Sequence, residues 1–217
     1  MTDYARLRTA MVDCQVRPSD VTKYPIIEAL LDTPREAFVP RALRKVAYAG
    51  EDVPLGAGRV VLDPRVFAKM LDALNPQPQD LVLHIGAGLG YGPAVLSRIA
   101  GTVIALEDDA QRAGEAQEAL SAAGYDTVVV ETGPLAEGMA RHAPYDLILI
   151  EGGVEEIPPA LAAQLKPGGR IVALFMQGEL GVCRVGTRAG DAVSWRSVFN
   201  AGAPVLPGFE AARSFAL

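Results

Sequence analysis

The sequence is poor in cysteine and in long apolar runs, and each shortage argues against a class of protein. Only Cys14 and Cys183 occur among 217 residues, so neither a disulfide framework nor a cysteine metal site is expected, and both should be single buried or half-buried thiols. No apolar run approaches the roughly 20 residues of a membrane span. The N-terminus carries charges without a following apolar core, which argues against a signal peptide. We therefore expect a cytoplasmic protein without a membrane partner.

An excess of positive charge is also missing. Lysine and arginine total 20 against 26 aspartates and glutamates, for a net charge of −6, and the arginines are scattered. A nucleic-acid surface is therefore not expected. Hydrophobic residues, in contrast, make up 50% of the chain, which is enough for the core of one α/β domain with an extension. We expect a monomer.

The chain is organised around a glycine-rich stretch. Residues 81–85 are apolar or tolerated in strands and predict a short buried strand. Gly86, Gly88 and Gly90 follow it, and glycine lets a backbone turn sharply and approach a ligand closely. Residues 93–100 have the composition of a helix. Strand, glycine turn and helix N-terminus together predict a site for a polar or anionic group.

The spacing of the glycines narrows the choice among possible ligands. A dinucleotide site requires Gly-x-Gly-x-x-Gly, and here Tyr91 stands at the sixth position. The observed Gly-x-Gly-x-Gly is typical of S-adenosylmethionine-dependent methyltransferases. A second strand, residues 103–107, ends in Glu107, which could accept hydrogen bonds from both ribose hydroxyls. The alternative is a glycine-rich turn with an acid nearby by chance.

The remaining pattern predicts a doubly wound, Rossmann-like α/β fold with a mostly parallel sheet. Helices are expected at 4–16, 24–31, 35–43, 64–74, 110–123, 134–140 and 158–165. Further strands are expected at 127–131, 146–151 and 170–175, followed by an antiparallel hairpin, 181–188 and 194–199. Residues 46–61 read as a loop over the domain. We expect a helical, substrate-covering extension, 1–75, and a cofactor-binding domain, 76–217.

Several strings of the sequence, one of them within the glycine turn, resemble protein-L-isoaspartate O-methyltransferases. They are Thr33 to Pro40 (TPREAFVP), Pro54 to Gly58 (PLGAG), Gly88 to Tyr91 (GLGY) and Gln164 to Arg170 (QLKPGGR). The first is specific to that family. The resemblance spans about residues 8–176 and implies a class I methyltransferase fold that uses S-adenosylmethionine and releases S-adenosylhomocysteine. It also implies a protein or peptide substrate with an isoaspartyl or other carboxylate, methylated in the course of protein repair.

The resemblance implies the following cofactor-binding residues: His84, Gly86, Ala87, Gly88, Gly90, Tyr91, Glu107, Asp108, Thr132, Gly133 and Glu151. Three of these positions depart from the family. His84 replaces an acid, and either contacts the amino acid part of the cofactor or is a histidine satisfied by a backbone carbonyl. Thr132 lies where the family has an acid in a Gly-Asp-Gly turn, and could accept from the adenine amino group. Glu151 replaces part of a small polar turn.

The segment expected to hold the methyl acceptor also departs from the family. The family carries Thr-Ile-Ser-Gln-Pro where this chain has Val60, Val61, Leu62, Asp63 and Pro64. Both hydroxyls are absent, and Asp63 would repel an incoming carboxylate. A carboxylate is already a nucleophile, so the reaction needs an in-line approach in a dry pocket rather than a strong base. No catalytic residue is assigned.

Two functions are compatible with these observations. One is methylation of a carboxylate of damaged protein. The other is a catalytically impaired relative that binds S-adenosylmethionine or S-adenosylhomocysteine and acts as a regulatory or interaction module, which the missing hydroxyls favour. Motifs of methyltransferases acting on amines or on cytosine carbon are absent, and no clustered acids suggest a metal.

Overall fold

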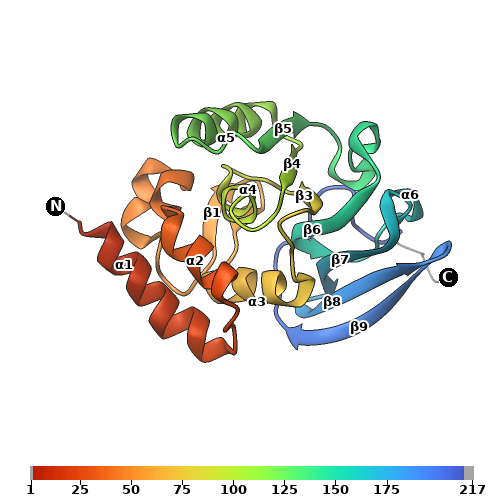
Figure 1. Ribbon diagram of the computed structural model, residues 1–217, viewed down its shortest axis with the longest axis horizontal. Helices are drawn as coiled ribbons and strands as arrows, with labels where there is room; N and C mark the ends of the chain where they lie inside the picture. The colour runs from red at the N-terminus through yellow and green to blue at the C-terminus, as the bar shows by residue number, and fades with distance from the viewer. Residues whose placement is uncertain (1, 213–217) are drawn as a thin grey trace.

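The computed structural model describes residues 2–212 and contains a seven-stranded sheet at its centre (Figure 1). Its strands, in the spatial order β5-β4-β3-β6-β7-β8-β9, are β5 Val128–Thr132, β4 Thr102–Glu107, β3 Leu81–Ile85, β6 Tyr145–Val154, β7 Leu165–Gln177, β8 Leu180–Ala189 and β9 Ala192–Asn200. The first five are parallel, and β8 and β9 are antiparallel. The predicted fold class is confirmed.

Alternate residues of the central strands face two apolar cores. Val82 in β3 and Leu149 in β6 belong to the larger one, which includes α3 (Pro64–Leu74) and α4 (Tyr91–Leu96). Leu83 and Ile150 belong to the smaller one, which includes α6 (Pro159–Ala162). Strands buried on both faces are typical of parallel sheets. The strand order reverses at β3, between β4 and β6, so the carboxyl end of β3 lies at the crevice where such sheets bind ligands.

The N-terminal region packs on the larger core. It contains α1 (Tyr4–Met11) and α2 (Tyr24–Asp32), which lie together beside α3 in Figure 1, and the chain from Val12–Val16 continues α1 as a π-helical turn. Residues of this region and of the sheet share a single apolar cluster. The division of the chain at residue 75 therefore stays a prediction.

The loop expected at 46–61 instead contains a two-stranded sheet, β1 (Val53–Gly56) and β2 (Arg59–Val61). Its turn has positive φ at Gly56, Ala57 and Gly58, as tight hairpins require. The strands are very short and β1 contains a proline, so their pattern was too weak to recognise. This hairpin carries the start of the expected acceptor segment.

Some expected helices were too long. Residues 35–43 form parts of two 3₁₀ segments, Arg35–Phe38 and Arg41–Val46, because Pro40 separates them. Residues 134–140 form only the 3₁₀ turn Leu135–Glu137 and the start of another, Ala140–His142, separated by Gly138 with φ 65°. Helix α6 is confined to four residues. Helix α5 (Ala110–Ala122) agrees with the prediction.

The two cysteines are not bonded to each other: Cys183 is buried, as expected, but Cys14 is exposed. Within residues 2–212, none of the helices combines the length and the apolar character that crossing a membrane requires.

Candidate active site

The glycine turn at the end of β3 has the backbone that its sequence predicts. Gly86, Gly88 and Gly90 have φ values of 83°, 56° and 101°, which residues with a Cβ rarely adopt. Gly90 is the N-cap of α4. The face of the turn is covered by the hairpin: a Cβ on Gly88 would lie 2.8 Å from Leu55 Cδ1, and one on Gly86 would lie 3.1 Å from Arg59 Nη2.

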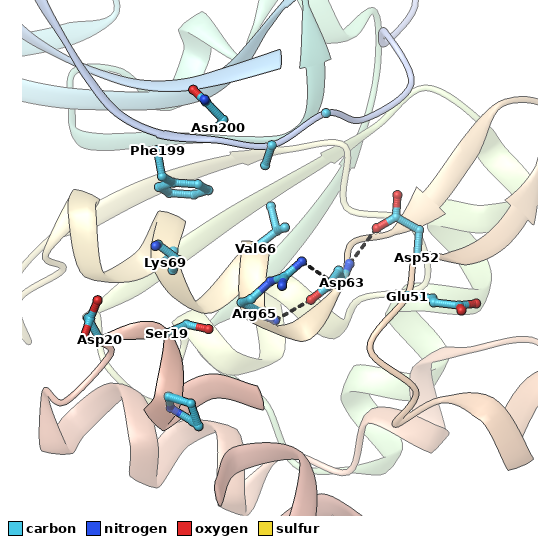
Figure 2. Close-up of a pocket in the computed structure, with 13 residues that line it drawn as sticks. Ser19, Asp20, Glu51, Asp52, Asp63, Arg65, Val66, Lys69, Phe199 and Asn200 are labelled. Carbon is cyan, nitrogen blue, oxygen red and sulfur yellow. Dashed lines mark hydrogen bonds and ion pairs between the residues drawn. The ribbon is translucent and has the colours of Figure 1, made fainter. Parts of the chain in front are cut away.

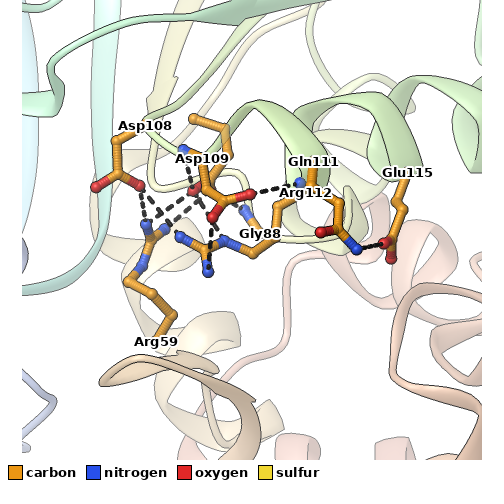
Figure 3. A network of polar contacts seen from close by, with 8 residues as sticks. Arg59, Gly88, Asp108, Asp109, Gln111, Arg112 and Glu115 are labelled. Atoms are coloured by element: carbon orange, nitrogen blue, oxygen red, sulfur yellow. Dashed lines mark hydrogen bonds and ion pairs between the residues drawn. The ribbon is translucent and has the colours of Figure 1, made fainter.

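Glu107 lies beside this turn, at the end of β4, and is fully buried. Its Oε2 accepts from the Gly88 amide at 2.7 Å and from Arg59 Nη2 at 3.0 Å. Its Oε1 accepts from Arg59 Nη1 at 2.9 Å and from Arg112 Nε at 3.1 Å. Figure 3 shows these arginines converging on the acidic end of β4. Burial raises the pKa of Glu107, and the arginines oppose that shift.

Asp108 extends the same network toward solvent. Its carboxylate lies 2.7 Å from Arg59 Nη1 and 3.3 Å from Arg112 Nη2, and its side chain is 24% exposed. Two guanidinium groups thus face two neighbouring carboxylates, one buried and one accessible.

His84 and Glu151 form a second buried pair. His84, in β3, is fully buried, and its Nε2 lies 2.9 Å from Oε2 of Glu151 in the adjacent strand β6. A Cβ on Gly92 would collide with both side chains, so the pair lies directly against the start of α4. Within residues 2–212, Nδ1 of His84 has no hydrogen-bond partner. The partner of this histidine is thus a carboxylate, which neither interpretation of the sequence anticipated.

Other expected cofactor residues occupy different environments. Thr132, the last residue of β5, is exposed, and the amide of Gly133 donates to the carbonyl of Glu107 at 3.0 Å. Tyr91 is buried, with its ring 6.4 Å from that of Phe38 and 5.8 Å from that of Phe67. The ring of Tyr91 is therefore part of the core.

His142 is half-buried. Its Nε2 lies 2.8 Å from Oε1 of Glu131, and Arg141 also pairs with that carboxylate. Although burial opposes it, these two contacts lower the pKa of Glu131. The acid next to Thr132 is therefore engaged with the 3₁₀ turn that follows.

Arg35 holds the backbone of the acceptor segment, residues 60–64. This fully buried side chain donates from Nη2 to the carbonyl of Leu62 at 2.7 Å and from Nε to that of Ala47 at 2.6 Å. Its guanidinium carbon lies 4.7 Å from the centre of the Tyr91 ring. An arginine of the family-specific string thus positions the backbone of the acceptor segment.

Asp63 has a structural role at the end of this segment. Its carboxylate accepts from the Arg65 amide at 2.7 Å and caps α3, while its own amide donates to Asp52 at 2.7 Å. Arg65 Nη2 lies 3.5 Å from the same carboxylate. The charge of Asp63 is therefore partly compensated by the helix N-terminus and by Arg65.

A cavity of about 690 Å³ opens next to Asp63 (Figure 2). Its charged lining residues are Asp20, Glu51, Asp52, Asp63, Arg65 and Lys69. Lys69 Nζ lies 4.8 Å from the centre of the Phe199 ring. Burial raises the pKa of Asp52. The acceptor segment thus adjoins a polar hollow with one aromatic wall.

Sequence reasoning missed two residues of this region, Arg59 and Arg112. The sequence signal for Arg59 is that it is the one basic residue in an otherwise apolar run before Asp63. The structure buries it, with 3% of the residue exposed. Arg112 lies five positions after Glu107, on the first turn of α5, where its side chain reaches back to that carboxylate.

Comparison with known proteins decides the family. The model of the protein-L-isoaspartate (D-aspartate) O-methyltransferases matches residues 8–196. The chain belongs to this family. It is 37% identical to the protein-L-isoaspartate O-methyltransferase of Pelotomaculum thermopropionicum, over 76% of this chain and 72% of that protein. It is 41% identical to the protein of the same name from Methylorubrum extorquens, over 78% and 74%.

A solved structure confirms the fold. The chain matches a structure from Plasmodium falciparum described as a putative protein-L-isoaspartate O-methyltransferase in complex with S-adenosyl-L-homocysteine. The TM-score is 0.79 at 15% identity, and the match covers 95% of this chain and 99% of the other.

The residues of this chain fit the cofactor of the family in two respects. Gly86, Gly88 and Gly90 place no side chain at three positions of the turn, and Glu107 supplies a carboxylate at the strand end beside it. Glu151 supplies a second buried carboxylate, one strand away from the position where the family carries its acid. These two acceptors therefore suit a nucleoside linked to a cationic amino group.

Proposed function

We propose that this protein is an S-adenosylmethionine-dependent methyltransferase acting on a carboxylate of isoaspartyl-containing protein or peptide. The observation that carries the proposal is Glu107, a buried carboxylate hydrogen-bonded to the glycine turn at the point where the strand order reverses. In folds of this kind, a carboxylate at that place binds a ribose. Membership of the family supports the methyltransferase over a non-catalytic binding module.

Each part of the cofactor has a corresponding group in the chain. Amides of the glycine turn and Glu107, with Asp108 beside it, would hold the adenosine ribose. Thr132 would accept from the adenine amino group, and Glu151, oriented by His84, would face the ammonium of the amino acid part. When bound, the cofactor supplies an electrophilic methyl group.

The chain positions the acceptor rather than activating it. Arg35 fixes the backbone of Leu62, and Asp63 fixes the start of α3. The acceptor segment is therefore held in place beside the substrate carboxylate that would receive the methyl group. Since a carboxylate is already nucleophilic, orientation and exclusion of water suffice. The cavity beside Asp63 would receive the neighbouring residues of a peptide. We propose a monomer in the cytoplasm, without a nucleic-acid partner.

The proposal is tested by calorimetry with S-adenosylhomocysteine and by transfer of a labelled methyl group to an isoaspartyl peptide. Glu107→Gln removes the charged acceptor and should weaken binding by about 1.5–3 kcal/mol. Glu115→Gln is the matched control, because Glu115 is an exposed carboxylate on α5 that bonds only Gln111 among the described residues. Equal affinity in the Glu107 variant and the wild type would contradict the assignment.

A further inference from the structure

The carboxylate proposed to bind ribose already has a complete set of donors from the chain. A carboxylate offers about four lone-pair sites. Glu107 accepts four hydrogen bonds of 3.1 Å or shorter, from Gly88, from Arg112 and twice from Arg59. Two ribose hydroxyls can therefore bind Glu107 only if two of these four hydrogen bonds are given up, and Arg59 is the one residue of the three that supplies two.

Arg59 is the donor in the position of a ligand. It comes from β2 of the two-stranded sheet and not from the seven-stranded sheet. Its two terminal nitrogens bond both oxygens of Glu107, as the two hydroxyls of a vicinal diol would. Its Nη2 also lies 3.1 Å from where a Cβ of Gly86 would be. The guanidinium thus takes both the hydrogen bonds and the space beside the turn.

Arg59 also has a second partner to which it can move. Asp108 lies 2.7 Å from Nη1 and is more exposed than Glu107, with side-chain exposures of 24% and 0%. A guanidinium that leaves Glu107 can keep its charge paired with Asp108, while Arg112 and Gly88 still bond Glu107. The cost of release is therefore smaller than that of leaving a buried arginine unpaired.

We propose that Arg59 is a specificity-determining residue that competes with the cofactor for Glu107. A ligand enters when its two ribose hydroxyls replace the guanidinium, and a ligand without the diol does not open the site. This inference rests on the proposed function, since it takes Glu107 as the ribose ligand. Binding to a protein in which only a fraction of molecules is open is weakened by that fraction.

The experiment is calorimetric titration of S-adenosylhomocysteine into the wild type, Arg59→Gln and Arg112→Gln. If Arg59 is on Glu107 in nine molecules of ten or more, Arg59→Gln binds about tenfold tighter or better. Arg112 is the matched control, because it donates to the same carboxylate but belongs to α5, which follows Glu107 in the chain, and not to the hairpin. Arg112→Gln should bring no gain.

Three results would overturn the competition. They are a wild type that binds as tightly as Arg59→Gln, an equal gain in Arg112→Gln, and a wild type that binds 2′-deoxyadenosine as tightly as adenosine. If neither the wild type nor Arg59→Gln binds any of these ligands, the proposed cofactor is wrong as well, so the two failures are distinguishable.

A measurement on the wild type covers the case in which Arg59→Gln does not fold. In protein labelled with ¹⁵N-arginine, the guanidinium signals of Arg59, assigned with Arg59→Lys, should show restricted rotation in the free protein. Saturation with S-adenosylhomocysteine should shift them, whereas those of Arg35, held by backbone carbonyls, should change little. Signals of Arg59 that stay unchanged while the ligand binds would contradict the exchange.

Discussion

Restoring hydroxyls to the acceptor segment should increase methyl transfer to isoaspartyl peptides. The perturbation is Val60→Thr, alone and together with Leu62→Ser, at the two positions where family members carry hydroxyls. Asp63 is left in place, because its carboxylate caps α3 and losing an N-cap costs about 0.5–2 kcal/mol. The change thus tests the hydroxyls without removing the cap.

The expected magnitude follows from the hydrogen bonds gained. Each oriented hydrogen bond to a carboxylate contributes roughly 1.5–3 kcal/mol, so one hydroxyl should raise the transfer rate about 10- to 100-fold at ~1.4 kcal/mol per tenfold. Leu62 is fully buried in the larger core, and truncating such a leucine costs about 2–5 kcal/mol of stability. Val60 is only half-buried, which makes Val60→Thr the cleaner test.

The assay is transfer of a radiolabelled methyl group from S-adenosylmethionine to an isoaspartyl peptide, with thermal denaturation run in parallel. Val60→Ala is the matched control, since it alters packing at the same position without adding a hydroxyl. We expect slow transfer by the wild type and by Val60→Ala, and faster transfer by Val60→Thr. A wild type that is as fast as Val60→Thr would refute the reasoning.

Three further predictions concern other polar side chains and the packing around them. Glu151→Gln should keep the contact with His84 but weaken binding of S-adenosylhomocysteine by about 1.5–3 kcal/mol in calorimetry; unchanged affinity would exclude Glu151 as the ligand of the ammonium group. Gly92→Ala should lower the free energy of unfolding by about 1–3 kcal/mol in urea titrations, because its Cβ would displace His84 and Glu151; undiminished stability would argue against that packing. Asp146 accepts from the Leu81 amide and Lys166 at 2.8 and 2.7 Å, and these bonds outweigh burial and lower its pKa below 3.8. Asp146 therefore stabilises the fold above that pH, and Asp146→Asn should cost about 1.5–3 kcal/mol at neutral pH, a deficit that vanishes as the pH falls through the lowered pKa; a deficit independent of pH would contradict this.

The sheet could be predicted because its signals are local. Apolar runs such as 103–107, separated by helices and by glycine or proline turns, fix parallel strands and their connections. The glycine turn and Glu107 were equally visible, since the spacing of the glycines and a carboxylate at a strand end follow from neighbouring positions.

The contacts around the site could not be predicted in the same way. Arg59 and Glu107 are 48 positions apart, and His84 and Glu151 are 67 apart, so no periodicity connects them. The hairpin that brings Arg59 to Glu107 has strands of four and three residues, too short for a clear alternation. Asp63 was expected to repel the acceptor because its role as a helix cap was overlooked, although an aspartate before Pro64 is a common start of a helix.

The measurement that tests the central claim most directly is calorimetric titration of the wild-type protein with S-adenosylhomocysteine, alongside Glu107→Gln and Glu115→Gln. We predict saturable binding to the wild type, the same affinity for the Glu115 variant, and binding about 10- to 100-fold weaker for the Glu107 variant. The absence of binding to a folded wild type, or equal affinity in all three proteins, would contradict the proposal that this site holds the cofactor.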